Sequence, residues 1–346
     1  MNQKKIISLV AVAIISGLIV YGAVLMYQVF SGNTKFEENE VYVYVPTDSD
    51  YEQVKKIISP YVKNIERFEM VANKASYPEN VKPGRFLFKK GMSSYDLVKA
   101  MRHNDPVNLA FNNQERLEDL AGRVGSQLEP DSLELLNTFK DTVFLKENGF
   151  NEENVFVMFI PNTYEFYWNT SAVKFRDKMI KEYNNFWNKE RTAKAEAQGL
   201  TPIQATILAS IVHKESVKKD ERPRIAGVYL NRLKLEMPLQ ADPTVIFAMK
   251  KKSNDFNQVI KRVFYNDLVM KHPYNTYVNI GLPPGPIAMP DITALEAVLN
   301  PEKNNYIYFC ASVDRFGYHE FAATLAEHNV NAKKYSDWII SQGVQR

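Results

Sequence analysis

The longest apolar run of the chain lies near its start and sets the first constraint on the fold. The 25 residues from 6 to 30 include no charged side chain, and Lys4 and Lys5 directly precede them. As an α-helix at 1.5 Å per residue, such a run is about 37 Å long, which is enough to cross a bilayer. With lysines on the short side, we expect residues 1–5 in the cytoplasm, a transmembrane anchor over 6–30, and the remainder outside the membrane.

A cleaved signal peptide is the alternative interpretation of this run. The apolar region of a signal peptide is usually about 7 to 15 residues long and ends at a small-residue cleavage site, which the stretch from Val24 to Phe30 does not supply. The sequence therefore predicts a single-pass protein of the cytoplasmic (inner) membrane. Its folded part, and hence its substrate, should be extracytoplasmic (periplasmic).

The composition predicts an ordinary folded protein beyond the anchor. The chain has 346 residues, 24% of them charged, which is enough for two or three modules. A net charge of +3 with both signs interspersed gives no reason to expect a nucleic-acid partner. Cys310 is the only cysteine, so internal disulfides are excluded, and its apolar setting predicts a strand residue without a catalytic role.

Strand and helix patterns alternate along the chain and predict an α+β fold. A polar stalk over 31–40 leads to a small α+β module over 41–105, which is either a spacer or a binding module. A larger mixed domain is predicted over 106–346. Its first part should contain a strand at 107–111, helices near 114–128 and 131–146, a buried strand at 156–160 and one long helix over 171–198.

The run from Thr201 to Ser216, TPIQATILASIVHKES, is the best-defined helix of this domain. Thr201 suits the N-cap, Pro202 suits the first turn, and Gln204 completes a capping box with Thr201. Apolar residues then recur at helical spacing and predict one stripe that faces a core. The members of this stripe are Ile203, Ile207, Leu208, Ile211 and Val212.

Glu215 is the next member of that apolar stripe. Burial disfavours the ionised form of a carboxyl group, so the pKa of Glu215 should rise, to roughly 6 as in known general acids. Two other interpretations stay open: Glu215 bends out to solvent in the last turn, or it pairs with Lys214, Lys218 or Lys219. His213 projects from the other side of the helix and forms neither a catalytic pair with Glu215 nor an HExxH-type motif.

Polar loops follow the helix, with prolines and glycines that favour fixed shapes. Residues 237–244 include Gln240, Asp242 and Thr244, and residues 274–277 read Tyr-Asn-Thr-Tyr. Such side chains can hold a ligand, although Asp242 before Pro243 is also a plain turn signal. The histidines show no ligand spacing, so neither a metal nor a cofactor is predicted.

Four long motifs resemble one known family. They are LASIVHKES (208–216), NRLKLEMPLQADPTVIFA (231–248), YNTYVNIGLPPGPIAMP (274–290) and YFCASVDRFGYHEFAATLAEHN (308–329). Together they are similar to the YceG-like, MltG-type family of endolytic murein transglycosylases. The resemblance is strong over 107–346. It is looser over 40–105, where residues 83–86 and 90–93 are similar to the family's LysM-like module.

The resemblance implies cleavage inside peptidoglycan glycan strands. The bond cut would join N-acetylmuramic acid to N-acetylglucosamine and leave a 1,6-anhydro-muramic end, terminating nascent strands beside cell-wall synthases (penicillin-binding proteins). The family's catalytic glutamate, in the pattern S-I-V-E-K-E-[ST], falls on Glu215, while His213 replaces the first acidic position. A second departure covers Met289 and Asp291, since residues 287–291 read I-A-M-P-D where the family has I-x-N-P-G, and it removes any substrate contact expected from that asparagine.

One carboxylate suffices for a lytic transglycosylase, whereas most glycosidases use two. Two rival functions remain on the sequence alone: a hydrolytic muramidase with Asp242 as its second carboxylate, and a non-enzymatic peptidoglycan-binding scaffold. The candidates for holding the glycan strand are Gln240, Asp242, Thr244, Tyr274, Asn275 and Tyr277.

Overall fold

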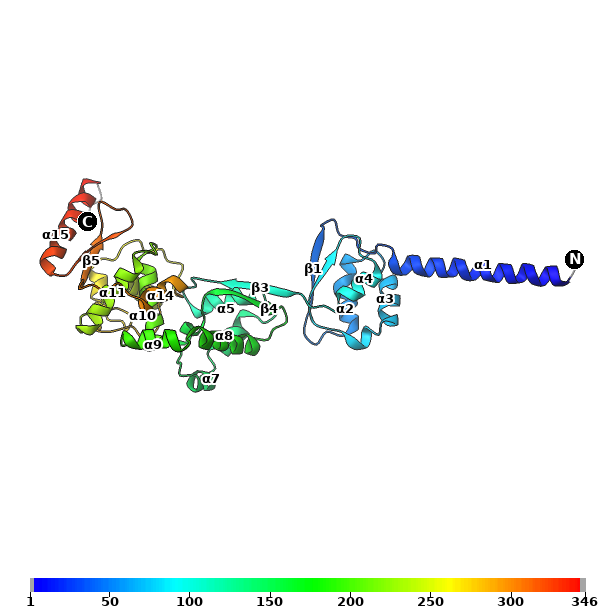
Figure 1. Cartoon of the computed structure of the whole chain (residues 1–346), viewed down its shortest axis with the longest axis horizontal. Helices are drawn as coiled ribbons and strands as arrows, with labels where there is room; N and C mark the ends of the chain where they lie inside the picture. Colours follow the sequence, from blue (N-terminus) through cyan, green and yellow to red (C-terminus); the bar gives the residue numbers. More distant parts are fainter. Residues whose placement is uncertain (1–2, 343–346) are drawn as a thin grey trace. The chain divides into compact units, whose positions relative to one another are not determined.

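The computed structural model of the protein describes residues 3–342 (Figure 1). These residues combine fifteen α-helices with three two-stranded sheets, which confirms the predicted α+β class. The chain forms two compact units. The first takes the residues up to Leu109 together with 127–130 and 164–171, and the second takes 110–126, 131–163 and the residues from Ala172 onward.

The first unit is a small α+β body built on one hairpin-like sheet. Its elements are α1 (Gln3–Phe30), β1 (Glu40–Val45), α2 (Tyr51–Ile58), η1 (Ser59–Tyr61), α3 (Ile65–Lys74), η2 (Pro78–Asn80), β2 (Gly84–Lys89) and α4 (Ser94–Ala100). Strands β1 and β2 are antiparallel, with Val43 opposite Phe86. Alternate residues of both strands point into a core that α2, α3 and α4 complete. The α+β character expected of 41–105 is thus present.

Helix α1 is long and apolar enough to cross a membrane, and none of its residues is buried. Its last turn is fastened to α3 by Arg67. The guanidinium of Arg67 donates to the carbonyl of Gln28 at 2.9 Å and to that of Ser31 at 3.0 Å. These are carbonyl groups that a helix end leaves without intrahelical partners. The end of the helix is therefore held against the first unit.

The segment expected to be a polar stalk, 31–40, is not free of the first unit. Asn33 and Thr34 are 0% and 5% exposed. The Asn33 amide donates to the carbonyl of Asn64 at 2.8 Å and to Ser94 Oγ at 3.0 Å, and Thr34 bridges to Val62. A buried side-chain amide can form hydrogen bonds with several groups at once. The polar residues Asn33 and Thr34 are therefore buried and hydrogen-bonded, and they are not part of an exposed stalk.

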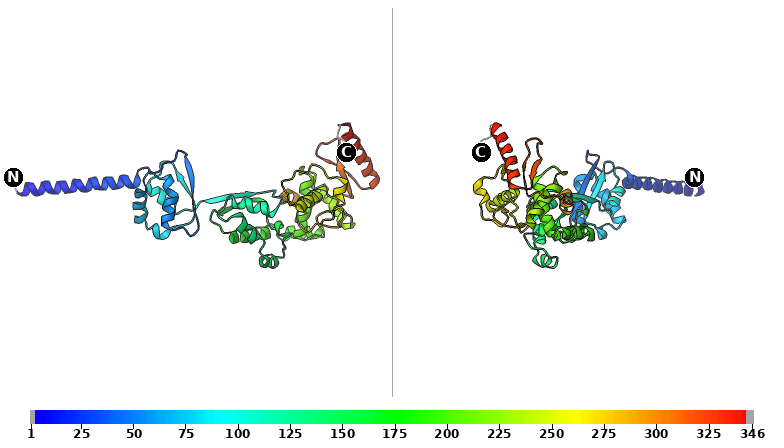
Figure 2. Two further views of the ribbon diagram at one scale, coloured as in Figure 1. Left: turned by 180° about the vertical axis from the view of Figure 1, so that it is seen from behind. Right: turned by 60° about the vertical axis from the view of Figure 1, so that its left-hand side comes forward.

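The second unit is mainly helical. Its elements are α5 (Leu117–Gly125), α6 (Ser132–Phe139), α7 (Thr142–Glu147), η3 (Val155–Met158), α8 (Ala172–Phe186), α9 (Lys189–Ala197), α10 (Pro202–Glu215), α11 (Arg222–Lys234), α12 (Asp242–Ser253), α13 (Tyr265–Leu268), α14 (Ile292–Leu299), β5 (Tyr308–Ala311), β6 (His319–Ala322) and α15 (Leu325–Ser341). Strands β3 (Pro106–Phe111) and β4 (Asn162–Tyr167) pair with each other and cross the division between the units. Helix α15 lies alongside β5 and β6 in each view (Figure 1 and Figure 2).

Three local expectations for this unit were wrong. The helix expected near 131–146 is divided into α6 and α7, with Asp141 as the N-cap of α7. The apolar stretch 156–160 is buried but forms the 3-10 turn η3, because a short apolar run specifies burial without specifying a strand. The long helix over 171–198 is broken into α8 and α9 at Trp187. Asn188 stands at the break and its side chain caps α9 by accepting from the backbone N–H of Arg191.

Helix α10 lies at the centre of the second unit. Its capping box forms as predicted, with the Thr201 hydroxyl accepting from the Gln204 N–H and the Gln204 side chain accepting in return. The eight residues from Ala205 to Val212 are all buried, so the helix is covered on every side and not along one stripe. Helices α9, α11, α12 and α14 pack around it. Its C-terminal residue is Glu215.

The glycine- and proline-rich loop 281–287 is fitted closely to its neighbours. The backbone N–H of Ile287 donates to Ser210 Oγ on α10 at 3.1 Å. A Cβ added at Gly285 would lie 1.9 Å from the carbonyl oxygen of Glu153 and 2.8 Å from Tyr274 Oη. Since a backbone carbonyl cannot swing aside as a flexible side chain can, only glycine fits at this position.

Replacing Gly285 by alanine is therefore expected to destabilise the second unit by about 1–3 kcal/mol, the usual cost of forcing extra atoms into a packed site. Differential scanning calorimetry of the full chain in detergent measures this. Gly122→Ala is the matched control, because nothing lies within 4 Å of the Cβ added there. An unchanged melting temperature for Gly285→Ala would show that the loop relaxes freely.

Candidate active site

Glu215 is the last residue of α10 and lines a cavity of about 460 Å³. Its carboxyl group is half-buried, and Tyr229 Oη donates a hydrogen bond of 2.6 Å to Glu215 Oε1. Tyr229 belongs to α11 and is fully buried. The two other interpretations of the sequence do not hold, because Glu215 neither bends away from the protein nor pairs with a lysine among the described residues.

Burial raises the pKa of Glu215 to about 7. The hydrogen bond from Tyr229 and the nearby His319 and Arg232 lower that pKa, while Asp242 raises it, but loss of hydration is the largest cause. The direction is the one predicted from the apolar stripe. Glu215 is consequently protonated in a large fraction of molecules at neutral pH, which is the state that a general acid requires.

Three of the predicted ligand-holding residues share the cavity with Glu215: Gln240, Asp242 and Tyr277. Asp242 begins α12, and Tyr277 Oη donates to Asp242 Oδ1 at 2.6 Å. Burial and this bond raise the pKa of Tyr277, so its hydroxyl stays a donor. Gln240 has a left-handed φ of 52° and an exposed side chain. The turn at 236–241 thus presents polar groups to the cavity.

The other three predicted residues do not reach this cavity. Thr244 is fully buried, and its hydroxyl donates to the carbonyl of Ala241 at 2.7 Å and meets Thr276 Oγ1 at 2.8 Å. Asn275 is also fully buried, and its amide donates to backbone carbonyls of the preceding loop, including that of Met270 at 2.8 Å. Tyr274 points into a second cavity. Thr244 and Asn275 therefore fix the loops that carry Gln240 and Tyr277.

Sequence reasoning missed several residues around Glu215. Arg232 is buried on α11, where its guanidinium donates to the carbonyls of Ile307 at 2.6 Å and Leu239 at 2.7 Å, and burial lowers its pKa. Arg232 thereby ties the 236–241 turn to the strand β5. The missed residues are Tyr229, Arg232, Tyr308, His319 and His328. Only the similarity of the YFCASVDRFGYHEF and AEHN stretches to family motifs pointed to the last three.

His319 is held in one orientation by a buried carboxylate. Glu221 is 5% exposed and accepts the backbone N–H of His319 and its Nδ1, both at 2.8 Å. Because a carboxylate only accepts, Nδ1 carries the proton, and Nε2 lies on the opposite edge of the ring. Ser216, which follows Glu215, donates its hydroxyl to the same carboxylate at 3.3 Å. The end of α10 and the strand β6 are thus joined through Glu221.

Two of the positions that depart from the family pattern, His213 and Asp291, lie together. His213 Nδ1 is 3.4 Å from Asp291 Oδ2, and both face the buried guanidinium of Arg222. Arg222 Nη1 donates to the two Asp291 oxygens at 2.7 Å and 2.8 Å. Asp291 also caps α14, and its bonds to Arg222 and Thr293 hold the pKa of its carboxyl at about 2. This cluster supports the far side of α10 from Glu215.

Across residues 3–342, no three His, Cys, Asp or Glu side chains are grouped closely enough to hold a metal ion. The Glu215 cavity presents a carboxyl group with a raised pKa, a carboxylate that accepts from a tyrosine, and further hydrogen-bonding side chains. Such a set can transfer protons and bind a polar, hydroxyl-rich ligand.

A half-buried carboxylic acid that faces polar loops defines a site for acid–base chemistry. Comparison with known proteins shows the family to which the chain belongs. The YceG-like family matches residues 43–334, so the chain belongs to the YceG-like family. The endolytic murein transglycosylase of Bacillus subtilis (strain 168) is 28% identical, over 93% of this chain and 91% of that protein. That of Streptococcus pneumoniae (strain D39) is 27% identical over 85% of this chain, which spans 58% of that protein.

A solved structure of a YceG-like protein is also similar to this chain. The crystal structure of a YceG-like protein from Listeria monocytogenes is 28% identical to this chain and superposes with a TM-score of 0.55. The match covers 85% of this chain and 99% of that one. The predicted family membership is thereby confirmed.

Proposed function

We propose that the protein is an endolytic lytic transglycosylase that cleaves peptidoglycan glycan strands between N-acetylmuramic acid and N-acetylglucosamine. The observation that carries this proposal is Glu215, a carboxyl group whose burial raises its pKa to about 7 inside an open polar cavity. The names of the B. subtilis and S. pneumoniae relatives support the same substrate and reaction.

Glu215 acts first as an acid and then as a base. Its proton passes to the glycosidic oxygen as the bond from that oxygen to C1 of the muramic residue breaks. The resulting carboxylate takes the proton of the C6 hydroxyl as O6 bonds to C1, which closes a 1,6-anhydro ring. The attack is intramolecular, so no water is consumed, and Glu215 ends in its starting state.

The neighbouring groups support this sequence of steps. Tyr229 donates to Glu215 Oε1, which stabilises the carboxylate formed after the first transfer and directs Oε2 as the remaining acid. Asp242, held by Tyr277, offers negative charge to the oxocarbenium-like transition state. The Gln240 side chain is exposed, and its amide can donate to an acetamido or hydroxyl group of the strand. The N-acetyl carbonyl of the substrate is a further stabilising group.

Helix α1 supports a place of action outside the cytoplasmic membrane. With α1 spanning the cytoplasmic membrane and Lys4 and Lys5 on its inner side, both compact units stand on the outer, periplasmic side, where peptidoglycan is made. There the enzyme would end nascent strands next to cell-wall synthases of the penicillin-binding type. The first unit, as a LysM-like module, would hold the strand or act as a spacer.

The products test this function. Full-length protein in detergent is incubated with purified peptidoglycan, and the soluble fragments are analysed by mass spectrometry beside those from Glu215→Gln. Fragments one water lighter than hydrolysis products, absent with the variant, are expected. Fragments that contain the added water would identify a muramidase, and binding without any fragments would identify a scaffold.

A muramidase is the second candidate, because Asp242 lies in the same cavity and raises the pKa of Glu215 through its charge. The replacement Asp242→Asn separates the two mechanisms. In a transglycosylase, Asp242 only stabilises charge, so we expect its replacement to lower kcat by roughly tenfold to a hundredfold. In a muramidase, Asp242 would be the base or nucleophile, and its replacement should abolish activity almost completely. Initial rates of fragment release measure this. A loss as large as that of Glu215→Gln would favour the muramidase.

A further inference from the structure

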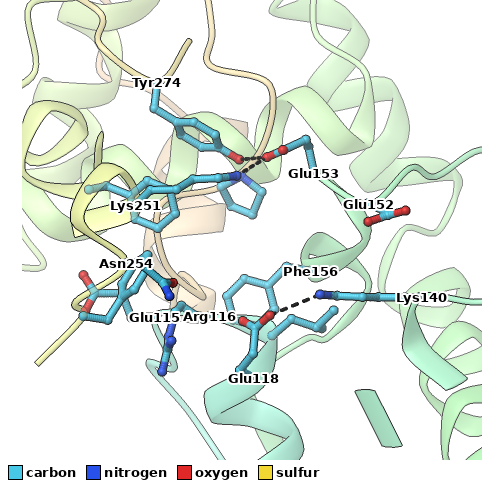
Figure 3. A pocket seen from close by; sticks show the side chains of 14 residues that line it. Glu115, Arg116, Glu118, Lys140, Glu152, Glu153, Phe156, Lys251, Asn254 and Tyr274 are labelled. Carbon is cyan, nitrogen blue, oxygen red and sulfur yellow. Dashed lines mark hydrogen bonds and ion pairs between the residues drawn. The ribbon is translucent and has the colours of Figure 1, made fainter. Parts of the chain in front are cut away.

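The second unit contains another cavity, of about 340 Å³, whose lining does not include Glu215 (Figure 3). Four aromatic side chains form its apolar part: Phe156, Phe247, Phe256 and Tyr274. Phe156, Phe247 and Tyr274 are buried, and the rings of Phe247 and Tyr274 are 4.8 Å apart at their centroids. The cavity therefore offers a fixed apolar wall, which suits an aliphatic or flat group of a ligand.

Charged side chains stand around this wall, and most of them are already paired. Lys251 donates to Glu153 at 2.6 Å, where Tyr274 Oη also donates at 2.8 Å. Lys140 donates to Glu118 at 3.2 Å. Figure 3 draws these pairs on two sides of the cavity. Each cation here has its charge balanced by a carboxylate.

The two remaining paired groups lie on the segment before α5. Arg116 bonds Asp119 at 2.5 Å, and Glu115 accepts from Lys250 at 2.9 Å. Glu152 is different: within residues 3–342 no hydrogen bond or ion pair involves its carboxylate, which stands apart from the dashed pairs in Figure 3. The cavity is left with one unbalanced negative charge beside aromatic rings. An alkylammonium group can balance this charge through a charge-assisted hydrogen bond to the carboxylate.

The two cavities lie at opposite ends of α12. Asp242 begins the helix in the Glu215 cavity, and Lys251 lines the second cavity nine residues later, which is about 14 Å along a helix axis. Tyr277 and Tyr274, three residues apart, also line one cavity each. An extended tripeptide spans roughly 10–11 Å, and the long side chain of a diamino acid at its end extends that reach. A short peptide attached to a sugar next to Glu215 is long enough to reach the second cavity.

We propose that the second cavity is a subsite for the peptide stem of the glycan strand, with Glu152 accepting a hydrogen bond from the side-chain ammonium of its diamino acid. This inference rests on the proposed function. The aliphatic part of the diamino acid packs on Phe156 and Tyr274. Peptide-bearing strands are then better substrates than bare ones.

Direct binding tests the subsite without any cleavage. Full-length protein in detergent is titrated by calorimetry with a soluble stem tripeptide that carries no sugar and a free side-chain amine. Glu152→Gln is expected to weaken binding about tenfold, as loss of a charge-assisted hydrogen bond does. Glu147→Gln, which removes an exposed carboxylate on α7 outside the cavity, is the matched control and should change nothing.

Acetylation of the peptide's side-chain amine identifies the group that Glu152 binds. The acetylated peptide should bind the wild type as weakly as the free peptide binds Glu152→Gln, and the variant should not distinguish the two peptides. Equal affinity of wild type and variant for the free peptide, or no binding to the wild type, overturns the proposal. So does displacement of the peptide by bare glycan fragments.

Cleavage rates separate this proposal from the proposed function. Glu152→Gln should lower kcat/KM about tenfold on strands that carry peptides and leave it unchanged on strands from which an amidase has removed them. If the wild type binds the peptide but cleaves neither substrate, the proposed function fails and the subsite stands. If the wild type cleaves both substrates equally well, the subsite fails and the function stands.

Discussion

Glu215→Gln should lower kcat on peptidoglycan by about a thousandfold, because acid–base catalysis contributes roughly a hundredfold to ten-thousandfold and here one carboxyl both gives and takes the proton. The amide keeps the size of the side chain and can still accept from Tyr229 Oη. Release of soluble fragments per minute measures the loss. Glu196→Gln, an exposed glutamate on α9, is the control and should retain full activity.

The pH profile of the wild type should report the same group. Because burial raises the pKa of Glu215 to about 7, the acid form predominates below that pH and kcat/KM should fall about tenfold per unit above it. Glu215→Gln should lose this descending limb along with its activity. A profile that stays flat to pH 9 would assign the proton transfer to a different residue.

The same replacement should stabilise the protein at neutral and higher pH. An unfolded glutamate has a pKa of about 4.3, so the folded state binds the proton more tightly than the unfolded state does. The stability contributed by protonated Glu215 is complete below about pH 4 and is lost as pH rises through 7. The glutamine of the variant does not ionise, so the variant does not lose this stability as the pH rises. Its melting temperature at pH 8 should exceed that of the wild type by a few degrees. No gain at pH 8 would argue against burial of the charge.

Local sequence signals predicted α10 well because its boundaries depend on neighbouring residues alone. Thr201, Pro202 and Gln204 bond or fit within one turn, so the capping box required no knowledge of the rest of the fold. The position of Glu215 followed from helical spacing. What the spacing did not reveal is that α10 is covered on all sides, since that depends on four other helices.

The ligand-holding residues were harder to predict for a physical reason. Polar residues in stiff loops either face the ligand or hold the loop, and the sequence looks the same in both cases. Gln240, Asp242 and Tyr277 face the Glu215 cavity, whereas Thr244 and Asn275 are buried and bonded to backbone groups. Residues such as Arg232 and His319 enter the cavity only through tertiary packing, so no local pattern marks them.

The departures from the family pattern have a structural explanation that the sequence alone did not show. His213 stands where the family has an acidic residue, and Asp291 stands where it has glycine. In the structure both contact Arg222, so the carboxylate that faces this guanidinium comes from the start of α14 and not from α10.

Arg222→Met should therefore destabilise the second unit by about 3 kcal/mol, since removing one partner of a buried ion pair leaves the other charge without compensation. The Arg222 side chain is 4% exposed, and its guanidinium also donates to the carbonyl of Ser216 at 3.0 Å beside Glu215. The expected fall in melting temperature is roughly 6–12 °C by calorimetry of the full chain. Arg224→Met is the control, because that pair with Glu302 is more than one-third exposed and should contribute less than about 1 kcal/mol.

A charge-relocation experiment tests the explanation itself. Asp291→Gly alone should destabilise the protein because Arg222 loses its carboxylate, although glycine remains an acceptable N-cap for α14. Adding His213→Glu should recover most of that loss, since Arg222 Nη2 lies 3.4 Å from the His213 ring and a glutamate there can reach it. If the double variant is as unstable as Asp291→Gly, the two departures are independent. Recovery would show that one buried arginine next to the catalytic helix end requires a carboxylate, whichever element supplies it.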